Sequence, residues 1–258
     1  MFDTHMHANN SHDGMQTYTD IQERQDELGI GVVITEHWDY DYPTVPEEFV
    51  YDLDAYFKTL NPIRSDKFLI GIEVGMQESI IPDNDRILKK YDFDMIIGAM
   101  HLMNRKDLYN MDIYQGRTKL DLLKEYLEAS IRNIRAFKNF DTFAHIDYIC
   151  RKWPFEDPEL YYEDNPLLWD EFFKALIDCG KTIEINTRRL SDPKAVKALT
   201  ALYTKAHEKG IVYCTIGSDA HYREHIGRDL AVALEIAKKA GLKVVYFKER
   251  KMIEIKDC

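Results

Sequence analysis

Histidines and acidic residues follow apolar, strand-like segments at six places along the chain. The residues at these places are His5, His7, His37, Glu73, His101, His145, Asp219 and His221. Imidazole nitrogens and carboxylate oxygens are ligands of zinc, iron and manganese. If the segments are neighbouring parallel strands, their ends meet at one rim, where barrel enzymes hold their active sites. The pattern therefore predicts a metal site assembled from distant parts of the chain.

Two of the six places carry residues separated by one position, His5 with His7 and Asp219 with His221. Side chains two positions apart in a strand point to the same face, so both members of a pair can reach one ion. Each pair alone also occurs in strands that bind no metal. The pairs therefore indicate a metal site only in combination with the other residues.

Glu73, His101 and His145 each end a separate apolar segment, with no obvious partner in the neighbouring sequence. Buried polar groups need a hydrogen-bonding partner or a metal ion. Taken together with the two pairs, these three residues predict a site that holds more than one ion.

Apolar segments alternate with longer amphipathic segments along the whole chain, which is typical of repeated β–α units around a parallel sheet. We expect seven strands, followed by a terminal strand pair, at 2–5, 31–35, 68–74, 93–100, 140–146, 181–186, 212–218, 244–247 and 252–255. We expect helices at 20–28, 53–63, 83–91, 119–138, 167–179, 193–209 and 228–240. The predicted fold class is α/β, a distorted seven-stranded (β/α) barrel.

The 258 residues contain no linker, low-complexity tract or charge block, so we expect a single domain over 1–258. No apolar run approaches the roughly 20 residues needed to cross a membrane. Four scattered cysteines without a Cys-x-x-Cys motif argue against a zinc ribbon or a disulfide framework. Because the first residues also lack the pattern of a secretory signal, we expect a soluble, cytoplasmic protein.

The charge balance excludes one class of partner. With 34 basic and 45 acidic residues, the formal net charge is −11, which repels a nucleic-acid backbone over most of the surface. We therefore expect no nucleic-acid partner and no membrane partner. A small anionic substrate is compatible with this charge, because metal ions and a few arginines can make one cleft locally positive.

Several motifs together resemble the PHP (polymerase and histidinol phosphatase) family, and in particular its free-standing histidinol-phosphatase branch. The residues that carry the resemblance are His5-Met6-His7, Thr35-Glu36-His37, Gly71-Ile72-Glu73-Val74-Gly75, His101, His145 and Ser218-Asp219-Ala220-His221. The resemblance covers nearly the whole chain. It implies a barrel of the PHP type with two or three divalent ions, which would be zinc, iron or manganese.

The resemblance also implies which residues bind each ion. The first ion would be held by His5, His7, Glu73 and Asp219, and Glu73 would bridge to a second ion held by His101 and His145. His12, His37 and His221 would hold a third ion. His12 lies in the loop after the His-x-His motif, where Ala8 departs from the usual threonine of the family.

The implied activity is that of a metal-dependent phosphomonoesterase, a histidinol-phosphatase (EC 3.1.3.15) of histidine biosynthesis. A metal-bridging hydroxide would attack the phosphorus in line, with Glu73 and Asp219 as catalytic residues. Asp219 or a metal-bound water would protonate the leaving alkoxide. The resemblance further implies that Arg151 and one of Arg188 or Arg189 bind the substrate phosphate, which suits the planar fork of arginine.

Three alternatives remain open at this point. The same metal centre could act on another small phosphomonoester or on phosphotyrosine. A metal-dependent deaminase or amidohydrolase uses a similar barrel, but such enzymes often have a carboxylated lysine at a strand end, where this chain has Glu73, His101 and His145. A non-catalytic PHP module is the third alternative. The identity of the metal and the oligomeric state are not determined by the sequence.

Overall fold

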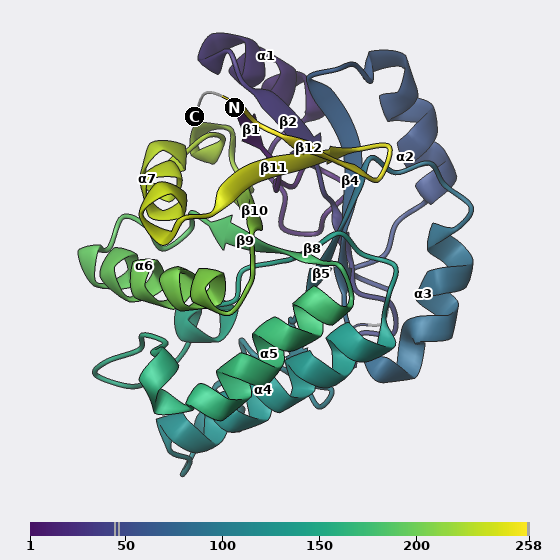
Figure 1. The fold of residues 1–258 in the computed structure, drawn as a ribbon. Helices are drawn as coiled ribbons and strands as arrows, with labels where there is room; N and C mark the ends of the chain where they lie inside the picture. Colours follow the sequence, from purple (N-terminus) through teal and green to yellow (C-terminus); the bar gives the residue numbers. More distant parts are fainter. Residues whose placement is uncertain (44, 46, 257–258) are drawn as a thin grey trace.

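Short parallel strands form one continuous sheet in the computed structural model, which describes residues 1–43, 45 and 47–256 (Figure 1). The order along the sheet is β1 (Phe2–Asp3), β2 (Gly31–Ile34), β4 (Phe68–Gly75), β5 (Met95–Ala99), β8 (Thr142–Phe143), β9 (Thr182–Asn186), β10 (Tyr213–Gly217), β11 (Lys243–Lys248) and β12 (Lys251–Glu254). All neighbours are parallel except β11 and β12. The α/β class and a strand in each of the nine expected segments are confirmed.

Three strands of two residues each were not expected, because they are too short to show a periodic pattern. They are β3 (His37–Trp38), β6 (Leu102–Met103) and β7 (Lys106–Asp107). The first of them matters for the site, since β3 pairs with β4 in a register that places His37 opposite Glu73.

Within the described part of the chain, seven α-helices surround the sheet (Figure 1). They are α1 (Tyr18–Leu28), α2 (Leu53–Leu60), α3 (Ile81–Leu88), α4 (Lys119–Ala136), α5 (Pro166–Asp178), α6 (Pro193–Glu208) and α7 (Leu230–Ala240). Local chemistry sets their ends: Thr17 and Asp20 form a capping box that starts α1, and Gly29 ends it with a φ of 66°. Each helix overlaps a segment that the sequence predicted.

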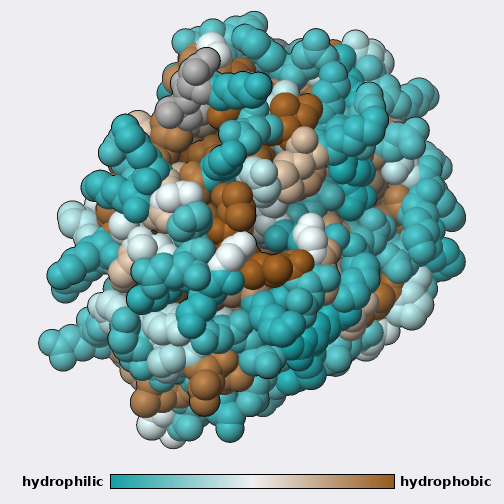
Figure 2. Space-filling view, viewed as in Figure 1, coloured by the Kyte–Doolittle hydropathy of each residue, from teal (hydrophilic) through white to brown (hydrophobic). Residues whose placement is uncertain are grey.

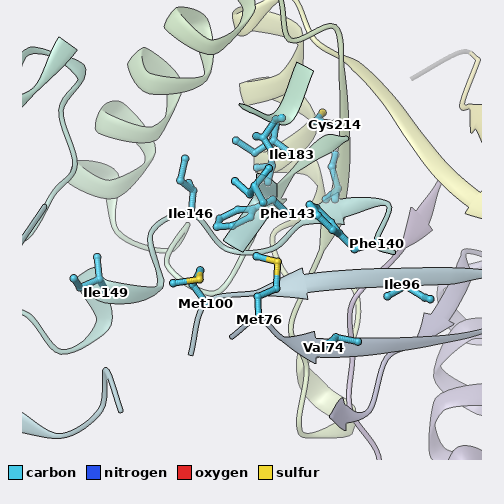
Figure 3. Close-up of a cluster of buried hydrophobic side chains, with 14 of the residues drawn as sticks. Val74, Met76, Ile96, Met100, Phe140, Phe143, Ile146, Ile149, Ile183 and Cys214 are labelled. Atoms are coloured by element: carbon cyan, nitrogen blue, oxygen red, sulfur yellow. The ribbon is translucent and has the colours of Figure 1, made fainter. Parts of the chain in front are cut away.

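The sheet buries apolar side chains on both faces, as expected for parallel strands. The larger hydrophobic cluster contains Ile96 of β5, Phe143 of β8 and Ile183 of β9, together with side chains of the helices (Figure 3). A smaller cluster on the opposite face contains Met95 and Ile97 of β5. Burying one such side chain fully contributes roughly 1.5–3 kcal/mol, so the two clusters hold the strands in a fixed register.

Backbone hydrogen bonds also join the chain after β1 to the chain after β10. The Thr4 amide donates to the Ile216 carbonyl, the Asp219 amide to the His5 carbonyl and the His7 amide to the Ala220 carbonyl, at 2.9, 2.8 and 2.8 Å. These bonds connect residues more than two hundred positions apart. They place the His5 and His7 side chains beside Asp219.

Figure 2 shows one face of the molecule, on which hydrophilic side chains predominate and hydrophobic ones form small separate groups. Among the helices of the described residues, none has the length and apolar character required to span a bilayer.

Candidate metal centre

Glu73 of β4 is fully buried and lies among the histidines that the sequence singled out. Its Oε1 lies 2.8 Å from His145 Nε2, 3.2 Å from His101 Nε2 and 3.4 Å from His5 Nε2. Its Oε2 lies 2.7 Å from His37 Nδ1. One carboxylate therefore faces imidazoles from four separate parts of the chain, an arrangement in which two cations can share it.

Asp219, two residues after the end of β10, is a second carboxylate that several histidines approach. Its Oδ1 lies 3.4 Å from His7 Nε2, 3.6 Å from His221 Nδ1 and 4.0 Å from His5 Nε2. The backbone of Asp219 has a φ of 54°, a left-handed conformation that aspartate adopts more readily than most residues. His7 also approaches Glu73 Oε2, at 3.7 Å, so the two carboxylates belong to one cluster.

Four sets of three side chains bring ligand atoms within 4.8 Å of one another: His5, His7 and Asp219; His5, Glu73 and His145; His7, His37 and His221; His37, Asp39 and His101. Within this cluster, Glu73 Oε2 and His101 Nε2 are buried; they lie 2.7 Å from His37 Nδ1 and 3.2 Å from Glu73 Oε1, but neither makes a hydrogen bond of normal geometry to a described residue. Buried polar atoms almost always have a partner. The residues therefore fit metal ions, which would occupy the positions that these atoms face.

Charges within the cluster shift the pKa values of its members. Burial opposes ionisation of Glu73, but His101, His5 and His37 outweigh it and hold the pKa of this carboxyl well below its ordinary value. Burial, together with the nearby His37 and His221, lowers the pKa of His7. The pKa values of His5, His37 and His101 are instead raised, because nearby carboxylates outweigh burial. Since neutral imidazoles bind metal ions, an ion bound here would displace protons from these three rings.

Two buried carboxylates next to the cluster were missed from the sequence. Asp39 follows β3, and its Oδ1 and Oδ2 lie 2.9 and 3.0 Å from His101 Nδ1, which directs the other ring nitrogen towards Glu73. Glu184 of β9 lies 2.8 Å from His5 Nδ1. The available signal was an acidic residue between the apolar Ile183 and Ile185 in a predicted strand.

The loop after the His-x-His motif is folded around Glu36, a fully buried residue. Glu36 Oε2 accepts hydrogen bonds from the amides of Ala8 and Ser11 and from Ser11 Oγ, at 3.0, 2.9 and 2.5 Å. Ser11 Oγ also lies 3.2 Å from His7 Nδ1 and accepts from the His37 amide at 2.9 Å. The loop thus presents Ser11 to the inside.

As a consequence, the structure does not bring His12 into the cluster. Its side chain is 56% exposed, and Nε2 lies 2.8 Å from Glu48 Oε1. The next residue, Asp13, lies next to the cluster instead: its Oδ2 lies 3.0 Å from His221 Nε2, and its Oδ1 lies 3.5 Å from His37 Nε2. The one feature of the sequence that pointed to Asp13 was its position directly after His12 in the same loop.

A cavity of about 250 Å³ opens beside the cluster. Two arginines line it, Arg151 and Arg188. Arg151 Nη2 lies 2.6 Å from Asp219 Oδ2, and Arg188 Nη1 donates to the Asp219 carbonyl at 3.0 Å. Arg189 points elsewhere and pairs with Asp147 and Glu159. The sequence did not decide whether Arg188 or Arg189 faces the substrate. In the structure, Arg188 lines the cavity and Arg189 does not.

The remaining wall of the cavity is aromatic and acidic, and it was not predicted. Tyr42, Phe49, Tyr109 and Tyr148 line it together with Asp107. The cavity is therefore lined by two arginines, four aromatic rings, the Asp107 carboxylate and residues of the cluster itself. A substrate with an anionic end and a cationic or aromatic end matches this distribution.

Buried imidazoles and carboxylates at the ends of parallel strands, next to arginines in a polar cavity, form a candidate metal site of the kind found in hydrolytic enzymes. Residues 3–188 match the family model of the PHP domain, and the chain belongs to this family. The resemblance stated from the sequence motifs is thereby confirmed.

Known proteins are similar over almost the entire chain. A relative from Clostridium acetobutylicum, named "Probable histidinol-phosphatase", is 39% identical over 98% of both chains. A crystal structure of histidinol phosphate phosphatase from Lactococcus lactis, complexed with zinc, L-histidinol and phosphate, covers 98% of both chains with a TM-score of 0.91 and 26% identity. A Listeria monocytogenes structure with 17% identity and a TM-score of 0.68 covers 90% of this chain and 99% of its own, and it shows the same fold.

Proposed function

We propose that this chain is a histidinol-phosphatase of histidine biosynthesis, which hydrolyses L-histidinol phosphate to L-histidinol and phosphate. The observation that carries the proposal is the likeness, over 98% of both chains, to a structure that holds zinc, L-histidinol and phosphate. The cluster around Glu73 and the cavity beside it supply the residue types that this reaction needs.

We assign the ligands of three divalent ions as follows. His5, His7, Glu73 and Asp219 would hold the first, Glu73, His101 and His145 the second, and Asp13, His37 and His221 the third, with Asp13 in place of His12. When bound, such ions lower the pKa of a coordinated water towards about 7 and offset the charge of the phosphoryl group. Zinc is the ion to test first, because a histidine-rich set suits it.

Asp219 is assigned as an ionised ligand of the first ion rather than as the proton donor to the leaving group. Burial opposes its ionisation, but Arg151 and His5 outweigh burial and hold the pKa of the Asp219 carboxyl well below its ordinary value. An ionised carboxylate holds no proton to donate to the leaving alkoxide. Such a weak base is suited to hold a cation rather than to accept a proton, so Asp219 would act as an ionised ligand and the alkoxide would take its proton from water.

Arg151 and Arg188 would bind the phosphate from the side of the cavity next to Asp219. Arg151 is held in place by Asn186, whose Oδ1 lies 3.3 Å from Nη2, and its guanidinium lies 4.8 Å above the Tyr148 ring. This fixes the planar donor fork before substrate arrives, which lowers the entropy lost on binding. Arg188 is 35% exposed and can adjust to the phosphate.

The aromatic wall of the cavity would receive the amino alcohol and imidazole of the substrate. Phe49 and Tyr109 offer ring faces, and the Asp107 carboxylate can pair with a cationic group. Together with the arginines, these residues favour a substrate that carries a positive or aromatic group as well as a phosphate.

Three further statements from the sequence are kept as proposals. The seven strands from β1 to β10, joined again by the bonds between the ends of β1 and β10, would form a distorted barrel of the PHP type. Residues 1–258 would form a single domain. The enzyme would work in the cytoplasm.

Phosphate release from a panel of substrates tests the function. The purified chain, supplied with zinc, is assayed on L-histidinol phosphate, nucleoside monophosphates, phosphotyrosine and a simple alkyl phosphate. We expect the highest kcat/KM on L-histidinol phosphate. A negligible rate on that compound, with turnover of another member of the panel, would show a different phosphomonoesterase.

A further inference from the structure

Glu184 is a fully buried residue of β9 whose carboxylate contacts His5, the His145 amide and Asn186. The neighbouring Ile183 lies in the hydrophobic cluster of Figure 3, so Glu184 points to the opposite face of the sheet. Among the described residues, no lysine or arginine forms an ion pair with it. A buried carboxylate without such a partner needs several hydrogen-bond donors.

The two oxygens of Glu184 have different donors. Oε2 accepts from the His145 amide at 2.8 Å and from Asn186 Nδ2 at 3.0 Å. Oε1 lies 2.8 Å from His5 Nδ1. Because an ionised carboxylate only accepts, His5 must carry a proton on Nδ1 in this contact. In the neutral ring, the lone pair is then on Nε2, which lies 3.4 Å from Glu73 Oε1.

The same carboxylate holds the backbone of a second proposed ligand. His145 has a φ of 21°, which is unusual for a residue other than glycine. Such a conformation persists only where the surroundings enforce it. The bond from the His145 amide to Glu184 lies at this residue, and the His145 ring reaches Glu73 Oε1 at 2.8 Å.

A glycine in the neighbouring strand makes room for this arrangement. A Cβ at Gly217 of β10 would lie 2.5 Å from Glu184 Oε1 and 2.3 Å from His5 Cβ. Both distances are too short for real contacts, so a larger residue at 217 would displace the carboxylate, the imidazole or both.

We propose that Glu184 is a positioning residue of the metal centre, which fixes the tautomer of His5 and the backbone of His145 at the same time. This inference rests on the proposed function. Glu184 does not line the cavity and is not assigned to an ion, so it acts through the two histidines. It joins ligands from β1 and from the end of β8 through a single side chain in β9.

The variant Glu184→Gln tests this role because it keeps the shape and changes only the donor pattern. Two amide donors face Oε2 and one imidazole faces Oε1, so the glutamine oxygen should occupy the Oε2 position. Its NH2 group would then face His5 Nδ1 and favour the tautomer with the proton on Nε2. That tautomer has no lone pair to offer the metal.

Zinc affinity is measured by competition with a chromogenic chelator, and zinc content by elemental analysis after dialysis. Loss of a partner that orients a metal-bound histidine typically costs about 10- to 100-fold in affinity, and we expect this loss for one ion. Long-range 1H–15N spectra of the zinc-loaded protein should show Nδ1–H for His5 in the wild type only. Unchanged affinity and an unchanged His5 spectrum in Glu184→Gln would overturn the proposal.

Asp141→Asn is the matched control. Asp141 is also a buried carboxylate, but it lies before β8, at the other end of the strand from His145, where it accepts from the Ile96 amide and from Arg250 Nε at 2.8 and 2.6 Å. The Asp141→Asn variant should have a lower melting temperature and an unchanged zinc affinity. If Asp141→Asn weakens zinc binding as much as Glu184→Gln, the effect is general destabilisation and the proposal is wrong.

A second variant covers the case in which Glu184→Gln does not fold. Glu184→Asp retains the carboxylate but is one methylene shorter, so it cannot reach both His5 Nδ1 and the His145 amide and should show the same loss of zinc affinity; wild-type affinity in Glu184→Asp would overturn the proposal. Zinc binding and phosphate release by the wild type distinguish a failure of this inference from a failure of the proposed function. A wild type that binds no zinc and releases no phosphate contradicts the function, whereas an active wild type with an equally zinc-bound Glu184→Gln contradicts only the role of Glu184.

Discussion

The substitution Gly75→Ala should weaken metal binding without touching any proposed ligand. Gly75 ends β4, and a Cβ at this position would lie 1.8 Å from Asp39 Oδ1 and 2.6 Å from Asp39 Cγ. The Asp39 carboxylate is at the end of a side chain, so it can rotate away. In doing so it leaves His101, which it holds through Nδ1 at 2.9 and 3.0 Å.

The size of the effect follows from these distances. Oδ1 must retreat by more than about 1 Å to reach an ordinary contact with the new Cβ, and a 2.9 Å hydrogen bond stretched by this amount is lost. Losing the partner that orients a metal-bound histidine costs about 10- to 100-fold in metal affinity, or roughly 1.4–2.8 kcal/mol. Overpacking costs the fold about 1–3 kcal/mol, so the protein should remain folded.

The assay is zinc affinity by chelator competition, combined with the melting temperature of the metal-free protein. Gly29→Ala is the control, because Gly29 ends α1 with a φ of 66° and no neighbouring atom lies within 4 Å of its Cβ position. It should destabilise the fold by about 1 kcal/mol while zinc affinity stays at the wild-type value. Wild-type zinc affinity in Gly75→Ala would refute the role assigned to Asp39.

Three further predictions concern the ligands and the cavity. Glu73→Gln should lower zinc content and reduce kcat by at least about 100-fold, measured by elemental analysis and phosphate release, because it removes the carboxylate that faces four imidazoles. Arg188→Ala should lower kcat/KM by about 10- to 100-fold, since a charge-assisted bond to phosphate is lost, whereas Arg189→Ala should retain wild-type kinetics. Asp13→Ala should remove about one zinc ion per chain, and His12→Ala should retain the full complement.

Each of these predictions has an outcome that contradicts it. Full zinc content and activity in Glu73→Gln would contradict the shared carboxylate. A larger kinetic loss in Arg189→Ala than in Arg188→Ala would reverse the assignment at the cavity. Loss of zinc in His12→Ala, with none in Asp13→Ala, would return the third ion to the ligand first predicted from the sequence.

The sequence predicted the strand ends well because the signal there is local. Each apolar run and the polar residue after it can be read within a few positions, and side chains at the ends of parallel strands converge whatever lies between them. The convergence of His101 and His145 on Glu73 is of this kind. The lengths of the strands were less predictable, since β1 and β8 have only two residues each.

The residues that the sequence did not predict depend on contacts between distant segments. Glu184 reaches His5 across 179 positions, and no local pattern reports such a pairing. The direction of the loop with His12 and Asp13 is set by Ser11 and the buried Glu36, which lie 25 positions apart. A choice between adjacent residues of a loop therefore depends on tertiary hydrogen bonds rather than on residue type.

The central claim is that this chain hydrolyses L-histidinol phosphate with bound metal. Its most direct test is phosphate release from L-histidinol phosphate by the purified protein, measured as isolated, after removal of metal with a chelator and after zinc is returned. We expect turnover that is lost with the metal and recovered with zinc. Turnover that survives complete removal of metal, or no turnover at full zinc occupancy, would contradict it.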